Sequence, residues 1–385
     1  MLRFSDGFDM ISGSGDVPIK YNGWLTGFFA GGILPGQGSP QALWMENSGG
    51  GVGQSFDVVI GTQDTIGAHM DYQPTSPLFS IEWLIFKNGG APILAFALNS
   101  VTGQMKIFGP GGSLIGTTVY AFTAGVWANL QVLANFGTNG SVAIYVNGAN
   151  ALSQPSIPVN FGTLLPDRVG FCAQGYILDN YVVWDGQPGD FFGNAMPGPM
   201  QIAPLPPTAD VATNWVPNVS GDTCTQMVND LVGVASGSPD GDLTVIFPGT
   251  QNQMFTMTAA QCFGLVLGVT MNTVIRAFES FDSVDFLING MGGSGVVGGA
   301  TINFPSYVND PGLGPNNIGL YQVYQITLGV SPNTGTQFTD AEINGDEWGF
   351  GCLPSYHLQV TQFYLEKITS LAGLPFNCGG GSYSF

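Results

Sequence analysis

The chain has 385 residues, of which 44% are apolar and 9% charged, and its formal net charge is −19. This length is enough for two domains of ordinary size. Because seven Lys and Arg stand against 26 Asp and Glu, the surface cannot neutralise many phosphates, which argues against nucleic acid and anionic membranes as partners. The most apolar run, Cys262 to Ile275, is interrupted by Gly and is shorter than the ~20 apolar residues of a membrane helix.

Short apolar runs bounded by Gly, Pro and Asn recur along the whole chain, and helical periodicity is nearly absent. Asn-Gly favours the tight turns of β-hairpins. Six such dipeptides begin at Asn22, Asn88, Asn139, Asn147, Asn289 and Asn344. We therefore predict an all-β fold of two antiparallel β-sandwich (jelly-roll) domains, since many short strands need two sheets to bury their faces.

The first domain is predicted to span residues 1–193, and its most regular part begins at Trp127. Strands are expected at residues 23–30, 42–46, 55–60, 79–87, 93–99, 104–108, 127–134, 141–146, 168–173 and 175–184. Turns are expected at Asn139-Gly140 and Asn147-Gly148. In the strand between these turns, Val142, Ile144 and Val146 share one face, while Ala143 and Tyr145 share the other. One face of this strand is therefore expected to be core.

The order of motifs in this domain carries a resemblance. The runs IYVNG (144–148), DRVGF (167–171) and YILDNYVVWD (176–185) resemble the second half of a concanavalin A-like or laminin G-like jelly-roll domain. The opening FSDGFDMI (4–11) resembles the first edge strand of such domains in bacteriophage virion proteins, and the run 332–344, followed by WGFGC and LQVTQFYLE, resembles their C-terminal part. Phe338 stands where these proteins usually have Trp. The resemblance implies a concanavalin A-like or laminin G-like first domain in a virion protein.

A proline-rich connector is predicted at residues 194–207, a second β-sandwich at 208–370 and a glycine-rich C-terminal tail at 371–385. The topology of the second sandwich does not follow from the pattern. Within it, Thr339 and Glu342 have the spacing of a capping box, which predicts a short helical turn.

Catalytic motifs are weak. The run Gly290–Gly295 fits G-x-G-x-x-G, but no helix is expected after it, so we predict a glycine-rich β turn rather than a dinucleotide site. His69 and His357 have no nucleophile elbow nearby, and no strand carries the acidic pairs of a glycosidase. The five cysteines lack zinc-ligand spacing and are expected to be free, buried thiols. We therefore predict that the protein is not an enzyme.

Two binding hypotheses remain. The resemblance brings Asp6, Asp9, Asp179 and Asp185 to one end of a laminin G-like domain, and carboxylates suit Ca²⁺; the alternative is that they are solvated turn residues. No other cofactor is expected. Trp24, Trp44 and Tyr72 are candidates for stacking on sugar rings, with the alternative that they belong to the cores.

The sequence thus favours a structural component of a bacteriophage particle, in the tail, baseplate or capsid surface, that assembles with itself and other virion proteins through interfaces of low charge. A trimer is the first expectation, by analogy with phage fibres. The N-terminus lacks the apolar region of a secretory signal, so a virion protein assembled in the host cytoplasm is expected. The alternative is a host-adsorption protein that binds surface glycan through loops of the first domain. A glycan-degrading virion enzyme is the third hypothesis.

Overall fold

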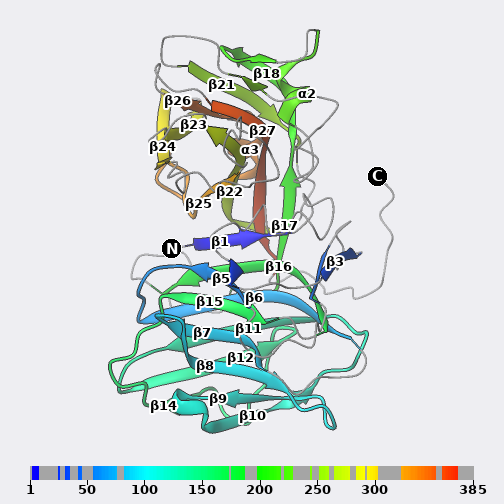
Figure 1. Cartoon of the computed structure of the whole chain (residues 1–385), viewed down its shortest axis with the longest axis vertical. Helices are drawn as coiled ribbons and strands as arrows, with labels where there is room; N and C mark the ends of the chain where they lie inside the picture. Colours follow the sequence, from blue (N-terminus) through cyan, green and yellow to red (C-terminus); the bar gives the residue numbers. More distant parts are fainter. Residues whose placement is uncertain are drawn as a thin grey trace, which may run out of the picture.

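The structure is a computed structural model. It describes residues 2–7, 25–26, 31–34, 42–45, 55–75, 82–172, 175–186, 197–217, 221–228, 243–244, 251–259, 264–277, 283–290, 293–301, 322–352 and 358–371. These residues form four antiparallel sheets, which pair into two β-sandwiches arranged along the long axis of the molecule (Figure 1). The predicted all-β, two-sandwich fold is confirmed. The helices of the described part are too short to cross a membrane.

The first sandwich is built from sheets 1 and 2. Sheet 1 consists of β1 (Leu2–Asp6), β3 (Gly31–Leu34), β4 (Ala42–Met45), β6 (Thr65–Pro74), β11 (Ala128–Asn135), β12 (Gly140–Val146), β13 (Ala149–Asn150), β14 (Ile157–Val159) and β16 (Tyr176–Asp185). Sheet 2 consists of β2 (Leu25–Thr26), β5 (Ser55–Val59), β7 (Glu82–Asn88), β8 (Ala91–Leu98), β9 (Gln104–Phe108), β10 (Leu114–Ala121) and β15 (Arg168–Cys172). A 3-10 turn, η1 (Pro110–Gly112), joins β9 to β10.

The second sandwich is built from sheets 3 and 4. Sheet 3 consists of β17 (Met200–Leu205), β19 (Val216–Pro217), β20 (Leu243–Thr244), β22 (Leu265–Ala277), β25 (Gln322–Leu328) and β27 (Leu358–Ser370). Sheet 4 consists of β18 (Pro207–Thr213), β21 (Gln251–Met257), β23 (Ser283–Gly290), β24 (Gly293–Thr301) and β26 (Glu347–Cys352). Two short helices, α2 (Cys224–Val228) and α3 (Asp340–Gly345), complete it.

The first core confirms the predicted strand alternation. Val142, Ile144 and Val146 of β12 are buried between sheets 1 and 2, whereas the residues between them are partly exposed. The turn at Asn147-Gly148 has positive φ at both residues, 52° and 78°, as predicted. The prediction of a turn at Asn139-Gly140 is wrong in detail, because Gly140 is already the first residue of β12 and the positive φ lies at Gly137.

The second core contains the predicted capping box. The Thr339 side chain accepts a hydrogen bond from the Glu342 amide, and the Glu342 carboxylate accepts one from the Thr339 amide. This fixes α3 so that Phe338 is buried in the core. Cys224 is a free, buried thiol, as expected, and Cys352 is also buried. In the glycine-rich run at 290–295, Gly290 of β23 pairs with Gly293 of β24, so β23 is followed by an antiparallel strand and not by a helix. The two residues of the predicted turn lie outside the described residues.

The predicted connector 194–207 contains a strand of the second sandwich. Residues 200–205 form β17, which pairs with β27 from Met200 opposite Ser370 to Leu205 opposite Leu365. Pro204, which has no backbone N–H, is tolerated because β17 pairs with β27 alone and needs no backbone donors for a strand on its other side. The exact limits of the connector and the domains, and the tail beyond Leu371, lie partly outside the described residues and stay predictions.

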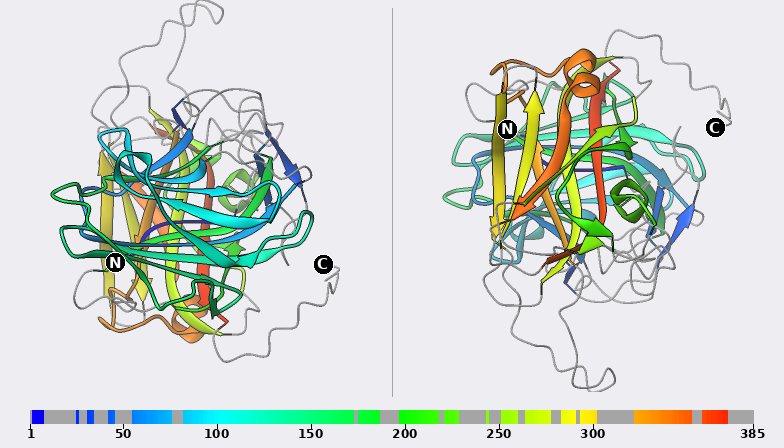
Figure 2. Two further views of the ribbon diagram at one scale, coloured as in Figure 1. Left: turned by 90° about the horizontal axis from the view of Figure 1, so that it is seen from below. Right: turned by 90° about the horizontal axis from the view of Figure 1, so that it is seen from above.

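The two sandwiches meet through the outward face of sheet 1. A separate apolar cluster joins Val182 and Trp184 of β16 to Met200, Ile202, Leu267 and Ile368 of the second sandwich. Strand β1 lies between the two sandwiches, paired with β16 and in contact with β22, β25 and β27 (Figure 1). Seen along the long axis, the strands of the two sandwiches run across one another (Figure 2).

Candidate functional site

The outward face of sheet 1 is the face directed away from the first core, and its side chains form cross-strand rows. The first row comprises Tyr145, Gln131 and His69, the second Ala143, Leu133, Gly67 and Trp184, and the third Ser141, Asn135 and Thr65. A further row brings Asn129 beside Asp71. This face is rich in amides and hydroxyls, although alternate residues of the same strands are apolar and lie in the core.

One part of this face, called here the covered half, comprises His69, Asp71, Asn129, Gln131 and Asn180. All five side chains are at most 5% exposed. Asp71 accepts hydrogen bonds of 2.8 Å from both Asn129 and Asn180. His69 lies 3.3 Å from the Asn129 amide nitrogen and 3.2 Å from that of Gln131. The covered half is therefore a buried polar layer.

Burial changes the ionisation of this layer. Desolvation raises the pKa of Asp71 to about 7, although the hydrogen bonds from Asn180 and Asn129 oppose the shift. Desolvation also lowers the pKa of His69 to about 3, against a backbone hydrogen bond with Met200. Both shifts favour the uncharged form, as expected for groups removed from water.

The covered half is attached to the second sandwich by hydrogen bonds. The Ile202 amide donates to the Asn180 side-chain oxygen at 2.7 Å, and the Gln131 amide donates to the Gly198 carbonyl. Asn180 has a φ of 51°, at a bulge in the pairing of β16 with β6. Gly67 has no side chain because the Trp184 ring occupies its place: an added Cβ would lie 1.9 Å from the ring. These residues serve the junction rather than a ligand.

The remaining part, called here the open half, comprises Tyr145, Ala143, Ser141 and Asn135, which are all partly exposed. Asn135 is held in place: its side-chain oxygen accepts from the Thr65 hydroxyl at 2.9 Å, and its amide donates to the Ser141 hydroxyl at 3.2 Å. The Tyr145 and Ser141 rows are four residues apart along β12, about 13 Å by strand geometry, with the Ala143 row between them. The open half thus offers an aromatic ring beside ordered hydrogen-bonding groups.

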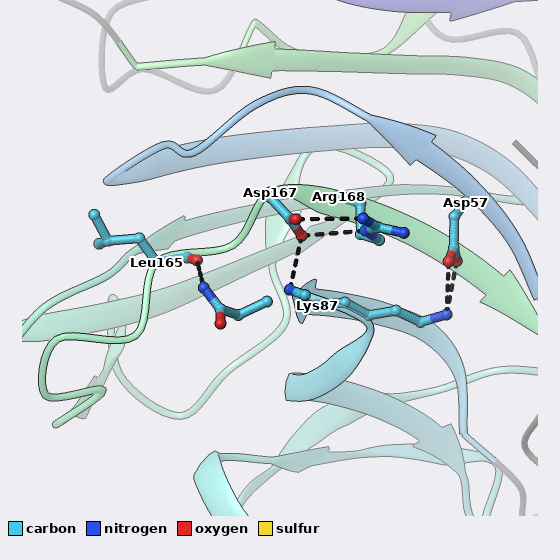
Figure 3. A network of polar contacts seen from close by, with 7 residues as sticks. Asp57, Lys87, Leu165, Asp167 and Arg168 are labelled. Carbon is cyan, nitrogen blue, oxygen red and sulfur yellow. Dashed lines mark hydrogen bonds and ion pairs between the residues drawn. The ribbon is translucent and has the colours of Figure 1, made fainter.

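A second polar network lies on sheet 2 (Figure 3). Lys87 extends from β7 to Asp57 on β5, with its Nζ 2.7 and 2.9 Å from the two carboxylate oxygens, and both side chains are buried. Arg168 pairs with Asp167, which also accepts from the Gly89 amide at 3.2 Å. Because each charge already has a partner of opposite sign, we interpret this network as structural.

The described calcium candidates, Asp6, Asp179 and Asp185, are buried, and each pairs with a different residue of the sheet. Asp6 pairs with Tyr181, Asp179 with Asp71, and Asp185 with Ile66, and all three aspartates are 0% exposed. Asp9 lies outside the described residues. Within the described part of the chain, no three His, Cys, Asp or Glu side chains come together as a metal site. Calcium binding stays a prediction, and the described residues do not form a set of ligands for it.

The candidates for sugar stacking have different outcomes. The prediction for Tyr72 is wrong, because its ring is 2% exposed and stacks on Trp83 in the first core at 4.3 Å between centroids. Trp24 and the Trp44 side chain lie outside the described part. Tyr145 is not among the candidates predicted from the sequence, although strand alternation places it on the face opposite the core, and this is the signal that identifies it.

No protein-family model matches the sequence, and no curated protein matches it. Among solved structures, the cellulose-induced protein Cip1 is similar with a TM-score of 0.36 and 12% identity over 47% of this chain and 96% of that one. Domain 4 of the arabinanase AbnA of Geobacillus stearothermophilus, in complex with arabinotriose, is similar with a TM-score of 0.35 and 12% identity. The match covers 48% of this chain and 92% of that one. A Bacillus subtilis protein with a galectin-like fold is similar with a TM-score of 0.32 and 10% identity, and the match covers 48% of this chain and 96% of that one.

All three TM-scores are below 0.5. At such TM-scores these likenesses carry no argument about function.

Proposed function

We propose that the first sandwich is a carbohydrate-binding module and that the open half of sheet 1 is its binding face. One observation carries this proposal: Tyr145 is partly exposed on the same face as Asn135 and Ser141, whose side chains are already hydrogen-bonded into position. A sugar ring has apolar C–H faces and a rim of hydroxyls. An aromatic ring stacks on the C–H face of the sugar, and amide or hydroxyl groups form hydrogen bonds with its hydroxyls.

The fixed amide and hydroxyl support the proposal energetically. A binding group that is ordered before the ligand arrives loses less conformational entropy on binding. Asn135 is such a group, since it sits on β11 between Thr65 of β6 and Ser141 of β12. This differs from the predicted use of loops in the first domain, because the proposed face is made by strands.

Binding without cleavage is part of the proposal. Hydrolysis of a glycosidic bond needs two carboxyl groups placed on either side of it. Tyr145, Ala143, Ser141 and Asn135 include no carboxylate. The ionisable groups nearest in the rows, His69 and Asp71, are buried in the covered half.

The test is a glycan array followed by titration calorimetry with the full-length protein. Tyr145→Ala is expected to weaken binding at least tenfold, Tyr145→Phe to retain it because the ring remains, and Asn135→Ala to weaken it severalfold. Thr117→Ala, an exposed position on β10 of sheet 2, is the control and is expected to bind normally. Equal affinities for Tyr145→Ala and the native protein would contradict the proposal.

A place in a bacteriophage particle is the second candidate function. It is supported by the motif resemblance and by exposed valines of the first sandwich, since Val101, Val119 and Val126 are 90%, 60% and 51% exposed and suit packing against a neighbouring copy. The two functions are compatible, because an adsorption protein both assembles and binds. Tracing of this chain in electron-microscopy maps of a purified particle supports this candidate, and a protein that stays monomeric at high concentration and is absent from virions excludes it.

A further inference from the structure

The segment that builds the open half carries no side chain that is charged at neutral pH. From Ile107 to Pro166 there is no Lys, Arg, Asp, Glu or His. Strands β11, β12, β13 and β14 all lie in this segment. Every contact that their side chains offer to a ligand is therefore an amide, a hydroxyl, a phenol or an apolar group.

Cations are also missing from the neighbouring strands of the face. Neither β6 nor β16 contains Lys or Arg, whereas they carry Asp71, Asp179 and Asp185. A carboxylate or sulfate on a sugar would leave water here without gaining a charged partner, which costs free energy. The net charge of −19 adds long-range repulsion of anions.

Lys87 and Arg168, the basic residues of the polar network on sheet 2, do not change this conclusion. Their strands, β7 and β15, belong to the other sheet of the sandwich. Lys87 is paired with Asp57, and Arg168 with Asp167. An acidic ligand on the open half therefore finds neither side chain on its own sheet.

We propose that the open half selects neutral glycans, built from uncharged hexose or pentose units, over uronate-, sialate- or sulfate-containing ones. This inference rests on the proposed carbohydrate-binding function. In this arrangement one sugar ring stacks on Tyr145, while hydroxyls of a neighbouring sugar unit meet Asn135 and Ser141 beyond the small side chain of Ala143. Because no charge pair forms, binding changes little with ionic strength.

The experiment compares two sets of polysaccharides on the full-length protein at 50 and 500 mM NaCl. The neutral set is β-glucan, mannan, galactan and arabinan; the acidic set is alginate, polygalacturonate and sialylated or sulfated glycans. We expect binding within the neutral set only, with less than a twofold change in Kd between the two salt concentrations, and loss in Tyr145→Ala. The variant Ala143→Lys, which adds one cation to the face, is expected to gain measurable, salt-sensitive binding to polygalacturonate.

The outcomes separate this inference from the proposed function. Binding to an acidic glycan that Tyr145→Ala abolishes overturns the neutral selectivity while it supports the carbohydrate-binding face. Absence of binding to both sets overturns the proposed function and the selectivity with it. Binding to neutral glycans that falls more than tenfold at high salt overturns the selectivity mechanism, because it requires a charge contact.

Discussion

The covered and open halves of sheet 1 have similar residues and different roles. Both consist of outward side chains of neighbouring strands, and both are rich in amides. In the covered half Asn180 and Gln131 bind backbone groups of the second sandwich, whereas in the open half the partners of Asn135 among the described residues are its neighbours in the sheet. The segment that packs over a polar row, rather than the composition of the row, therefore decides whether it becomes a junction or a binding face.

The two halves also differ in what an unpaired polar atom costs. The side-chain oxygens of Asn129 and Gln131 are buried without a hydrogen-bond partner, and such atoms destabilise a fold by about 1–3 kcal/mol each. In the open half water satisfies any free group at little cost. Substitutions should therefore affect stability in the covered half and ligand affinity in the open half.

The largest effect is expected for Trp184→Ala. Trp184 is 0% exposed, fills the space beside Gly67 and belongs to the apolar cluster that joins the sandwiches. Its loss should lower the free energy of unfolding by about 3–5 kcal/mol. Chemical denaturation measures this, with Tyr145→Ala as the matched aromatic truncation, expected to cost less than about 1 kcal/mol. Similar losses for the two variants would contradict the distinction between the halves.

A smaller effect is expected at Asn180. Replacement by Ala removes the hydrogen bonds to Asp71 and Ile202 and leaves a side chain at a φ of 51°, so we expect a loss of about 2–4 kcal/mol. Asn180→Gly removes the same hydrogen bonds without the backbone strain and should be about 1 kcal/mol more stable than Asn180→Ala. Thermal and denaturant unfolding of the pair tests this; equal stabilities would show that the left-handed backbone is not maintained.

The stability contributed by Asp71 and His69 of the covered half depends on pH. The folded pKa of Asp71 is about 7 against 3.8 ordinarily, so its stabilising contribution is full below pH 3.8 and is lost as pH rises through 7. The folded pKa of His69 is about 3 against 6.5, so its contribution is full above pH 6.5 and is lost as pH falls towards 3. The two contributions oppose each other between these limits.

Asp71→Asn leaves only the His69 contribution. The Tm difference between this variant and the native protein should therefore become more positive as pH rises from 4 to 7. His69→Gln should give the opposite trend, with a Tm difference that becomes more negative over the same range. Calorimetric scans at several pH values measure both, and parallel curves for all three proteins would contradict the buried, uncharged layer.

The smallest effect on stability is expected for Asn135→Ala. It removes two hydrogen bonds at a partly exposed site, which should cost about 1 kcal/mol or less. The same change should weaken glycan binding severalfold. Unfolding and calorimetric titration on one preparation measure both, and a large stability loss with unchanged affinity would assign Asn135 to the junction instead.

Local patterns predicted the elements of this fold well. Alternation assigned both faces of β12, and the Thr339–Glu342 spacing identified the cap of α3. Turn residues gave the hairpin at Asn147-Gly148 but misplaced the neighbouring one, since Gly137 rather than Gly140 supplies the positive φ. These features depend on a few adjacent residues, which is why sequence was enough.

The site depended on contacts that local patterns do not contain. Tyr72 and Tyr145 are both aromatic residues on strands of sheet 1, yet the first packs on Trp83 and the second faces outward. Likewise, nothing near Asn180 indicates that its partner is the Ile202 amide on a strand of the other sandwich. Side-chain alternation predicts which face of a strand a residue lies on. Whether another segment packs over that face depends on contacts between distant parts of the chain.

The most direct test of the account is a structure of the full-length protein in complex with the neutral oligosaccharide that binds best. We expect one sugar ring against Tyr145, hydroxyls of a neighbouring sugar unit within hydrogen-bond distance of Asn135 and Ser141, and an unchanged junction at Trp184. A sugar bound elsewhere, or one that reaches His69 by separating β17 from sheet 1, would contradict it.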